Sequence, residues 1–219
     1  MEKGIARFAP LTGIAAVVLG VLSFILAQTW ADEPDTDAPA AEIALWMTDK
    51  SWEILISGWI WWLAAGAFLW FLGSLRSVLG PAEGGTRRVT SIAFSAGAVA
   101  TVFAASLFVP VVAGAAADEF DDRTISPETA DALWVLGSGV FLVAEIAFGV
   151  LIVAVALVVV RTGALPRWYG WLSALYGLWL LILPIGWIGL IGLPIWILLT
   201  TILVWMAESK AGAPAATAG

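Results

Sequence analysis

The chain has 219 residues, of which 61% are hydrophobic and only 12% are charged. About a quarter of the residues in a soluble globular domain are charged, so this composition excludes such a domain and indicates a protein embedded in lipid. The formal net charge of -7 argues against nucleic acid as a partner, because phosphate binding needs clustered Lys and Arg. The chain has no Cys and no His, which removes disulfides and the usual ligands of zinc and haem, so we expect no cofactor.

Apolar stretches long enough to cross a bilayer recur along the chain. A helical span needs about 20 mainly apolar residues. Six predicted spans cover residues 8–30, 52–75, 89–114, 132–160, 168–184 and 190–206. The sequence therefore predicts an all-α fold, in which residues 1–210 form a single polytopic transmembrane bundle of six helices.

The first span, residues 8–30, follows Lys3 and Arg7 and has a signal peptide as its alternative interpretation. Signal-peptide cores have about 7 to 15 apolar residues, and this stretch is longer, so we expect a retained anchor. Residues 31–51 are rich in Ala, Pro and Asp and predict an acidic outer loop that is disordered or only locally ordered.

The fourth helix has clear start and stop signals. Ser126 can cap it, Pro127 fits its first turn, and Glu128 favours the positive end of the helix dipole. Gly163 and Pro166 predict its end. The fourth helix should therefore stand partly above the membrane, because it is longer than one span.

The stretch from Trp168 to Met206 carries no charge and would cross the bilayer nearly twice as one straight helix. Pro and Gly residues cluster between positions 184 and 194, so we expect a turn there and a helix on each side. A tight turn and the broken helix of a transporter are the two interpretations of this cluster. Residues 211–219 are small and predict a disordered tail.

The Lys and Arg residues alternate between the two sides of the predicted bundle. Loops one and three contain only Lys50 and Arg123 of the ten basic residues, and the other eight lie in the termini and the even loops. Since cytoplasmic loops carry the excess of Lys and Arg, both termini should be cytoplasmic in a multi-pass protein of the plasma membrane. Trp59, Trp61 and Trp62 lie deeper than the interfacial tryptophans, where packing is the commoner role.

Two stretches carry a resemblance to a known family. "FLWFLGSLRSVLG" (residues 68–80) and "LVVVRTGALPRWYGWLSALYGL" (residues 157–178) resemble small six-helix inner-membrane proteins of high-GC Gram-positive bacteria, a domain-of-unknown-function family. The connector Arg-Thr-Gly-x-x-Pro-Arg-Trp is the most specific part. The resemblance implies the fold and an inner-membrane location but no activity. The connector itself predicts a tight basic turn, with anionic lipid headgroups as an alternative ligand of Arg161 and Arg167.

Glu145 is a lone carboxylate in the apolar run from Leu142 to Gly149. An acid at a helix centre costs about 2.5 to 3.5 kcal/mol, so it usually faces the bundle interior. No intramembrane cation is available to pair with it, so we expect a protonated side chain that donates a hydrogen bond. Its helix face mixes small and bulky residues, and a neighbouring helix could approach closely there. That face carries Ser138, Phe141, Gly149, Ile152 and Ala156, and the candidate polar partners at similar depth are Ser23, Thr101, Ser106 and Tyr176.

Other chemistry finds less support in the sequence. Asp118, Glu119, Asp121 and Asp122 could collect calcium, but they lack the EF-hand spacing, so we expect no metal site. General acid-base and nucleophilic mechanisms need a second positioned group, which the predicted spans do not offer. We therefore predict a non-catalytic structural or interaction component, whose partners are the lipid bilayer and another membrane protein or a second copy. The alternative is a small proton- or cation-linked transporter or channel that uses Glu145.

Overall fold

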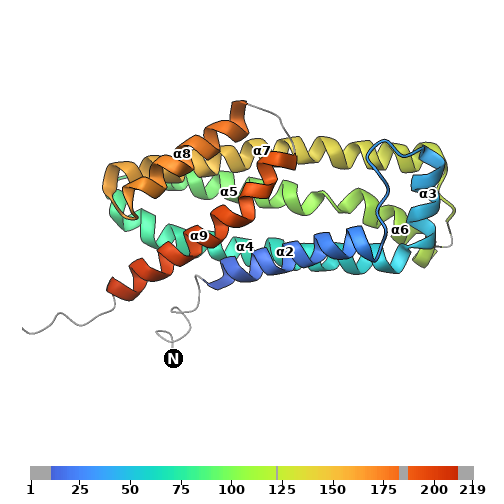
Figure 1. Ribbon diagram of the computed structural model, residues 1–219, viewed down its shortest axis with the longest axis horizontal. Coiled ribbons are helices and arrows are strands. Elements are labelled where there is room, and N and C mark those ends of the chain that lie inside the picture. Colours follow the sequence, from blue (N-terminus) through green and yellow to red (C-terminus); the bar gives the residue numbers. More distant parts are fainter. Residues whose placement is uncertain (1–10, 122, 183–186, 212–219) are drawn as a thin grey trace, which may run out of the picture. The chain divides into compact units, whose positions relative to one another are not determined.

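The computed structural model describes residues 11–121, 123–182 and 187–211 (Figure 1). Over these residues the regular structure is helical throughout and includes no strand, so the predicted all-α class is confirmed. The helices are α2 (Thr12–Thr29), α3 (Ala40–Asp49), α4 (Ser51–Glu83), α5 (Arg88–Ser106), α6 (Val109–Asp121), α7 (Pro127–Thr162), α8 (Arg167–Ile182) and α9 (Trp187–Ala211).

Five of the described helical segments are long and apolar enough to cross a membrane. They are Thr12–Thr29, Ser51–Glu83, Arg88–Asp121, Pro127–Thr162 and Ile191–Ser209. Helix α8 has 16 residues and a length of about 24 Å, which is short of the roughly 30 Å of bilayer hydrocarbon. The structure thus indicates a membrane protein, while the count of six spans and the orientation stay predictions.

Three of the predicted features lie partly outside the described residues. The first span, predicted for residues 8–30, begins among residues 1–10, which are not described. Residues 183–186 contain the beginning of the predicted turn between the last two spans, and residues 212–219 contain nearly all of the predicted tail.

The chain divides into two compact units. The first unit comprises Met1–Ala15, Ala67–Ala98 and Glu145–Gly219, and the second comprises Ala16–Gly66 and Val99–Ala144. Helices α2, α4, α5 and α7 each contribute residues to both units. The single bundle expected for residues 1–210 stays a prediction.

In the first unit, α7 and α8 are joined by a short turn that the sequence predicts correctly. Gly163 has a φ of 70°, which is the left-handed conformation that glycine adopts most easily, and its N–H donates to the Val159 carbonyl at 2.9 Å. Pro166 then precedes the first residue of α8, Arg167. The predicted stop of α7 is confirmed.

Helices α7 and α8 then pack backbone to backbone (Figure 1). A Cβ atom added to Gly149 would lie 3.2 Å from the Gly177 carbonyl oxygen, and one added to Gly177 would lie 2.9 Å from the Val153 nitrogen. A Cβ atom at 2.9 Å would force the backbones apart, and one at 3.2 Å would be unusually tight, so glycine permits this crossing. The close approach predicted for this face of α7 is confirmed.

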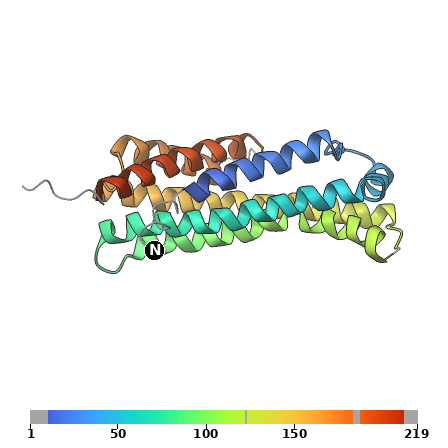
Figure 2. The ribbon, with the colours of Figure 1, turned by 90° about the horizontal axis from the view of Figure 1, so that it is seen from below.

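Helix α9 is tied to α8 by buried hydrogen bonds (Figure 2). The Trp196 indole N–H donates to the Ser173 hydroxyl at 3.0 Å. The Thr200 hydroxyl donates to the Trp196 carbonyl at 2.6 Å, so it accepts from the Tyr169 hydroxyl at 2.5 Å. These contacts join side chains of two helices where lipid offers no competing hydrogen bonds.

In the second unit, one predicted span is interrupted. Helix α5 ends at Ser106 and α6 begins at Val109, because Pro110 lacks an N–H and its ring clashes with the carbonyl four residues earlier. Beside the break, the Ala104 carbonyl accepts from the Leu107 N–H at 3.2 Å. The Trp61 indole also donates to the Ala104 carbonyl at 2.7 Å, and the Trp62 indole donates to the Ala105 carbonyl at 2.9 Å. The tryptophans thus add side-chain donors to carbonyls at the end of α5.

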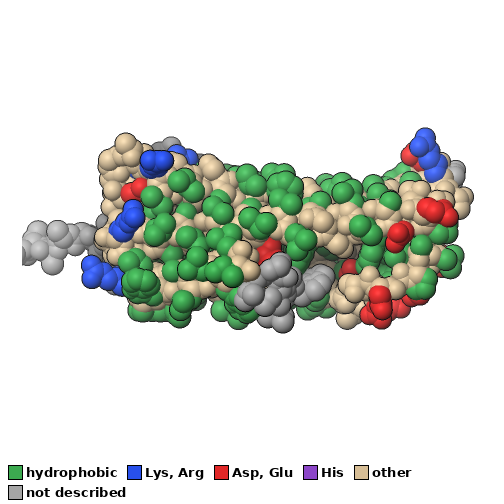
Figure 3. Space-filling view, turned by 90° about the horizontal axis from the view of Figure 1, so that it is seen from above, with side chains coloured by type: hydrophobic (Ala, Val, Ile, Leu, Met, Phe, Trp, Pro, Cys, Tyr) green, Lys and Arg blue, Asp and Glu red, His purple; other side chains and the backbone are tan. Residues whose placement is uncertain are grey.

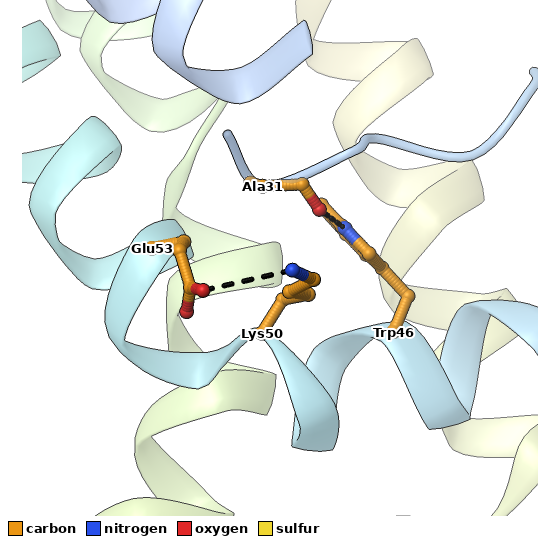
Figure 4. Close-up of polar contacts among 4 residues, drawn as sticks. All are labelled: Ala31, Trp46, Lys50 and Glu53. Carbon is orange, nitrogen blue, oxygen red and sulfur yellow. Dashed lines mark hydrogen bonds and ion pairs between the residues drawn. The ribbon is translucent and has the colours of Figure 1, made fainter. Parts of the chain in front are cut away.

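The predicted outer loop, residues 31–51, contains the helix α3, which packs on α6. Helix α3 buries one apolar face in a cluster formed with residues of the neighbouring segments. The buried members of that cluster are Ala31, Ile43, Ala44, Trp46, Met47, Ile54, Ala115 and Ala130. Figure 4 shows the Trp46 indole donating to the Ala31 carbonyl, at 2.6 Å, and the Lys50–Glu53 ion pair, at 3.7 Å. This part of the loop is therefore ordered by apolar burial.

Candidate functional site

Glu145 is buried in the first unit, with 2% of its side chain exposed. It projects from α7 toward the first turn of α9, where a Cβ atom added to Gly189 would lie 2.9 Å from its Oε1 and 2.6 Å from Leu180 Cδ2. A side chain at position 189 would therefore require Glu145 or Leu180 to shift. The burial expected for an inward-facing Glu145 is present, and its polar role stays a prediction.

Tyr176 reaches the same turn of α9 from α8. Its hydroxyl donates to the Gly189 carbonyl at 2.5 Å. A Cβ atom added to Gly192 would lie 2.8 Å from Cε2 of the Tyr176 ring. The start of α9 thus presents two glycines, three residues apart, to Glu145 and Tyr176. The sequence offered this spacing as a signal, but it could not identify which side chains meet the glycines.

The remaining candidate partners of Glu145 belong to the second unit. The Ser23 hydroxyl donates to the Ser57 carbonyl at 2.8 Å, and the Ser106 hydroxyl donates to the Val102 carbonyl of its own helix at 2.8 Å. Thr101 is buried, with 3% exposed. Of the four candidates, Tyr176 is the one that belongs to the same unit as Glu145, and it shares Gly189 as a neighbour.

The surroundings of Glu145 favour one protonation state of its carboxyl group. Its Oε1 is buried and has no hydrogen-bond partner among the described residues. An unpaired polar atom costs about 1 to 3 kcal/mol, and an unpaired buried charge costs considerably more. The arrangement therefore suits a neutral carboxylic acid, and an ionised one would need water or a cation at Oε1.

The basic residues of the predicted connector lie at the ends of their helices. Arg161 is in the last turn of α7 and Arg167 is the first residue of α8, and both are exposed. Figure 3 shows Lys and Arg side chains gathered at the end of the first unit that carries the α4–α5 and α7–α8 connections. Binding of lipid headgroups by these two residues stays a prediction.

The acidic residues near the end of α6 take part in packing. The Ser51 hydroxyl, at the start of α4, donates to Glu119 Oε2 at 2.8 Å. Asp122 lies outside the described residues. Within the described ranges, no group of three or more acidic side chains is placed to hold a metal ion. Glu119 therefore has a structural contact that joins two helices.

Comparisons with known proteins add no assignment, because no family model, no curated protein and no solved structure matches the chain. The resemblance to a six-helix family of high-GC Gram-positive bacteria stays a prediction.

Proposed function

We propose that this protein is a six-helix, non-catalytic component of the plasma membrane, with a structural or interaction role and both termini in the cytoplasm. The observation that supports the role most strongly is the packing of Glu145. Its carboxyl group is buried against Gly189 with 2% of the side chain exposed. A conduction or transport site needs access for water or an ion, whereas a packing contact between helices does not.

The contacts around this carboxyl group also favour a fixed assembly of helices. Tyr176 is hydrogen-bonded to Gly189, and buried hydroxyls join α8 to α9 further along. Such bonds hold neighbouring helices in one arrangement. The proposed partner is another membrane protein or a second copy of the chain, which would meet the protein within the lipid bilayer.

The orientation follows from the distribution of basic residues between alternate loops. It can be measured because the chain has no Cys, so a single introduced cysteine reports its own side of the membrane. Ser209→Cys should react with an impermeant thiol reagent only in inside-out vesicles, and Asp35→Cys only in right-side-out cells. The reverse pattern would overturn the proposed orientation.

A small proton- or cation-linked transporter or channel is the alternative. One observation favours it: the Oε1 atom of Glu145 has no hydrogen-bond partner in the described part of the chain. The atom lies against the glycine-containing first turn of α9, and interrupted helices often surround transporter sites.

The two functions are separated by flux measurements in proteoliposomes. Wild type, Glu145→Gln and the control Glu208→Gln would be reconstituted at equal density, with a proton gradient and then a sodium or potassium gradient imposed. We expect all three proteins to match empty vesicles. A flux in wild type that is lost in Glu145→Gln and kept in Glu208→Gln would contradict the proposal and support the transporter.

Association is tested separately by cross-linking in native membranes followed by size analysis of the solubilised protein. A discrete complex, either of two or more copies or with one other membrane protein, is the expected result. A monomer without any partner at native expression would contradict an interaction role.

A further inference from the structure

Helix α3 has an exposed face opposite its buried one. Glu42, Leu45 and Asp49 follow one another at spacings of three and four residues, so they lie along one side of the helix. All three are exposed, and Leu45 is 62% exposed. On the other side of the helix, Ile43 and Met47 are buried. Helix α3 therefore presents an apolar side chain between two carboxylates on its exposed face.

Two exposed aromatic rings lie just beyond the end of α3. Trp52, in the first turn of α4, is 54% exposed, and Phe120, in the last turn of α6, is 66% exposed. Their ring centroids are 6.2 Å apart, in an edge-to-face arrangement. The hydrogen bond from Ser51 to Glu119 joins the same two helix ends. The two rings are thus held together while much of their apolar area stays uncovered.

The charge of this region is strongly one-sided. The described residues of the second unit include twelve acidic side chains but only Lys50 and Arg123 as basic ones. Lys50 is already paired with Glu53. Figure 3 shows Asp and Glu side chains gathered at the end of the unit that carries α3. The exposed apolar side chains therefore lie in a negative field, which attracts cationic groups and repels anionic ones.

This charge distinguishes between the occupants that such a surface could have. A second copy of the chain would bring the same acidic face, so the two copies would repel each other there. Phospholipid headgroups are zwitterionic or anionic, and the anionic ones attract basic segments of membrane proteins. A protein that exposes Lys or Arg beside apolar side chains is complementary to this surface in both charge and chemistry.

We propose that the exposed face of α3 and the Trp52–Phe120 pair form a docking surface for a basic extramembrane segment of another membrane protein. Lys or Arg side chains of the partner pair with Glu42 and Asp49, and its apolar side chains contact Leu45 and the two rings. Aromatic side chains commonly anchor such interfaces. The buried cluster beneath α3 holds the surface in shape before the partner binds, which lowers the ordering cost of binding. This inference rests on the proposed interaction role, adds a contact outside the bilayer, and favours another membrane protein over a second copy.

Site-specific photo-crosslinking in native membranes tests the docking surface. A benzophenone amino acid replaces Leu45 in the full-length protein, and the cross-linked peptide is sequenced by mass spectrometry after illumination. We expect an adduct with one membrane protein, at a segment rich in Lys and Arg. Glu42→Gln and Asp49→Asn together should reduce the adduct about fivefold, and Phe120→Ala about tenfold. Glu208→Gln, in the first unit, is the control and should leave the yield unchanged.

An adduct with lipid, with a second copy or with a segment that lacks Lys and Arg would overturn the docking surface. So would the absence of any adduct, or a yield that stays the same in the Glu42→Gln/Asp49→Asn and Phe120→Ala variants. The replaced side chains are exposed, so the variants should fold, and thermal unfolding of the purified proteins checks this. A complex found by general cross-linking without an adduct at position 45 would refute this surface alone, whereas a monomer without any partner would refute the proposed function as well.

Discussion

The two units of the chain differ in how their helices pack and in how their backbone polar groups are hydrogen-bonded. In the first unit, two glycines bring backbones together, since Cβ atoms added to Gly149 and Gly177 would lie about 3 Å from backbone atoms of the other helix. In the second unit, glycines meet the ends of side chains, as Gly114 meets the Met47 sulfur, and tryptophan indoles supply donors where a helix is broken.

The difference shows two solutions to one constraint. A backbone polar group in hydrocarbon needs a partner, because no water is present. Unbroken α7 and α8 satisfy their backbones internally and are free to pack closely through glycine. At the broken α5–α6 segment, the Trp61 and Trp62 indoles add side-chain donors to the Ala104 and Ala105 carbonyls. Changes to glycine should therefore disturb the first unit most, and changes to tryptophan N–H groups the second.

The largest effect is expected from Gly177→Ala. Its new Cβ would lie 2.9 Å from the Val153 backbone nitrogen, so the backbones of α7 and α8 must move apart. We expect the free energy of unfolding to fall by about 2 to 3 kcal/mol, measured by denaturant titration in mixed micelles. Gly73→Ala, on α4 with no atom within 4 Å of the added Cβ, is the control and should not be destabilised. Equal stabilities of the two variants would refute backbone packing in the first unit.

Trp61→Phe should have the next largest effect. The change keeps an aromatic ring but removes the N–H that the Ala104 carbonyl accepts. The Ala104 carbonyl keeps its bond from the Leu107 N–H, so loss of the indole donor should lower the free energy of unfolding by about 1 kcal/mol. Trp59→Phe is the matched control, because Trp59 is 62% exposed. If both variants lose the same stability, ring size and not the indole donor explains the effect.

Thr200→Val tests the hydroxyl network of the first unit. Valine keeps the shape of threonine but cannot bond Tyr169, and interhelical hydrogen bonds in membranes average about 0.6 kcal/mol. A double-mutant cycle with Tyr169→Phe should give a coupling energy of that size. A coupling of zero would mean that this hydrogen bond does not stabilise the packing of α8 on α9.

Glu33, in the connection after α2, should give the smallest effect. Burial raises the pKa of its carboxyl above the ordinary value of 4.5, and the hydrogen bond from Gln28, at 2.7 Å, opposes this increase. A raised pKa in the folded state means that the stabilising contribution is present below 4.5 and is lost as pH rises through the raised value. Glu33→Gln should therefore gain stability relative to wild type as pH increases from about 4 to 8, measured by thermal unfolding. If the stability difference between Glu33→Gln and wild type does not change with pH, the pKa of Glu33 is not raised in the folded protein.

The sequence predicted features that depend on local patterns. The cap at Ser126 and the stop at Gly163 gave the bounds of α7 to within a few residues, because helix ends are set by residues near in sequence. Burial of Glu145 was also expected from the cost of an exposed acid in hydrocarbon.

Features that depend on neighbours distant in sequence were missed. Helix α3 lies in a stretch whose Ala, Pro and Asp content predicts disorder or only local order, and its apolar face became visible only with α6 packed against it. The role of Trp61 required knowing that its indole lies beside the Ala104 carbonyl, 43 residues further along the chain. Gly189 meets Glu145 from more than 40 residues further along the chain, which no local pattern shows.

The central claim is that the carboxyl group at position 145 is packed away from water. Because the chain lacks cysteine, Glu145→Cys can be probed with a membrane-impermeant thiol reagent, using the exposed position Ser209→Cys as a reference. Our account predicts that Glu145→Cys stays unlabelled in folded protein under conditions that label Ser209→Cys completely, and reacts only after unfolding. Labelling of the folded Glu145→Cys protein at a rate near that of Ser209→Cys would show a wet site and contradict the account.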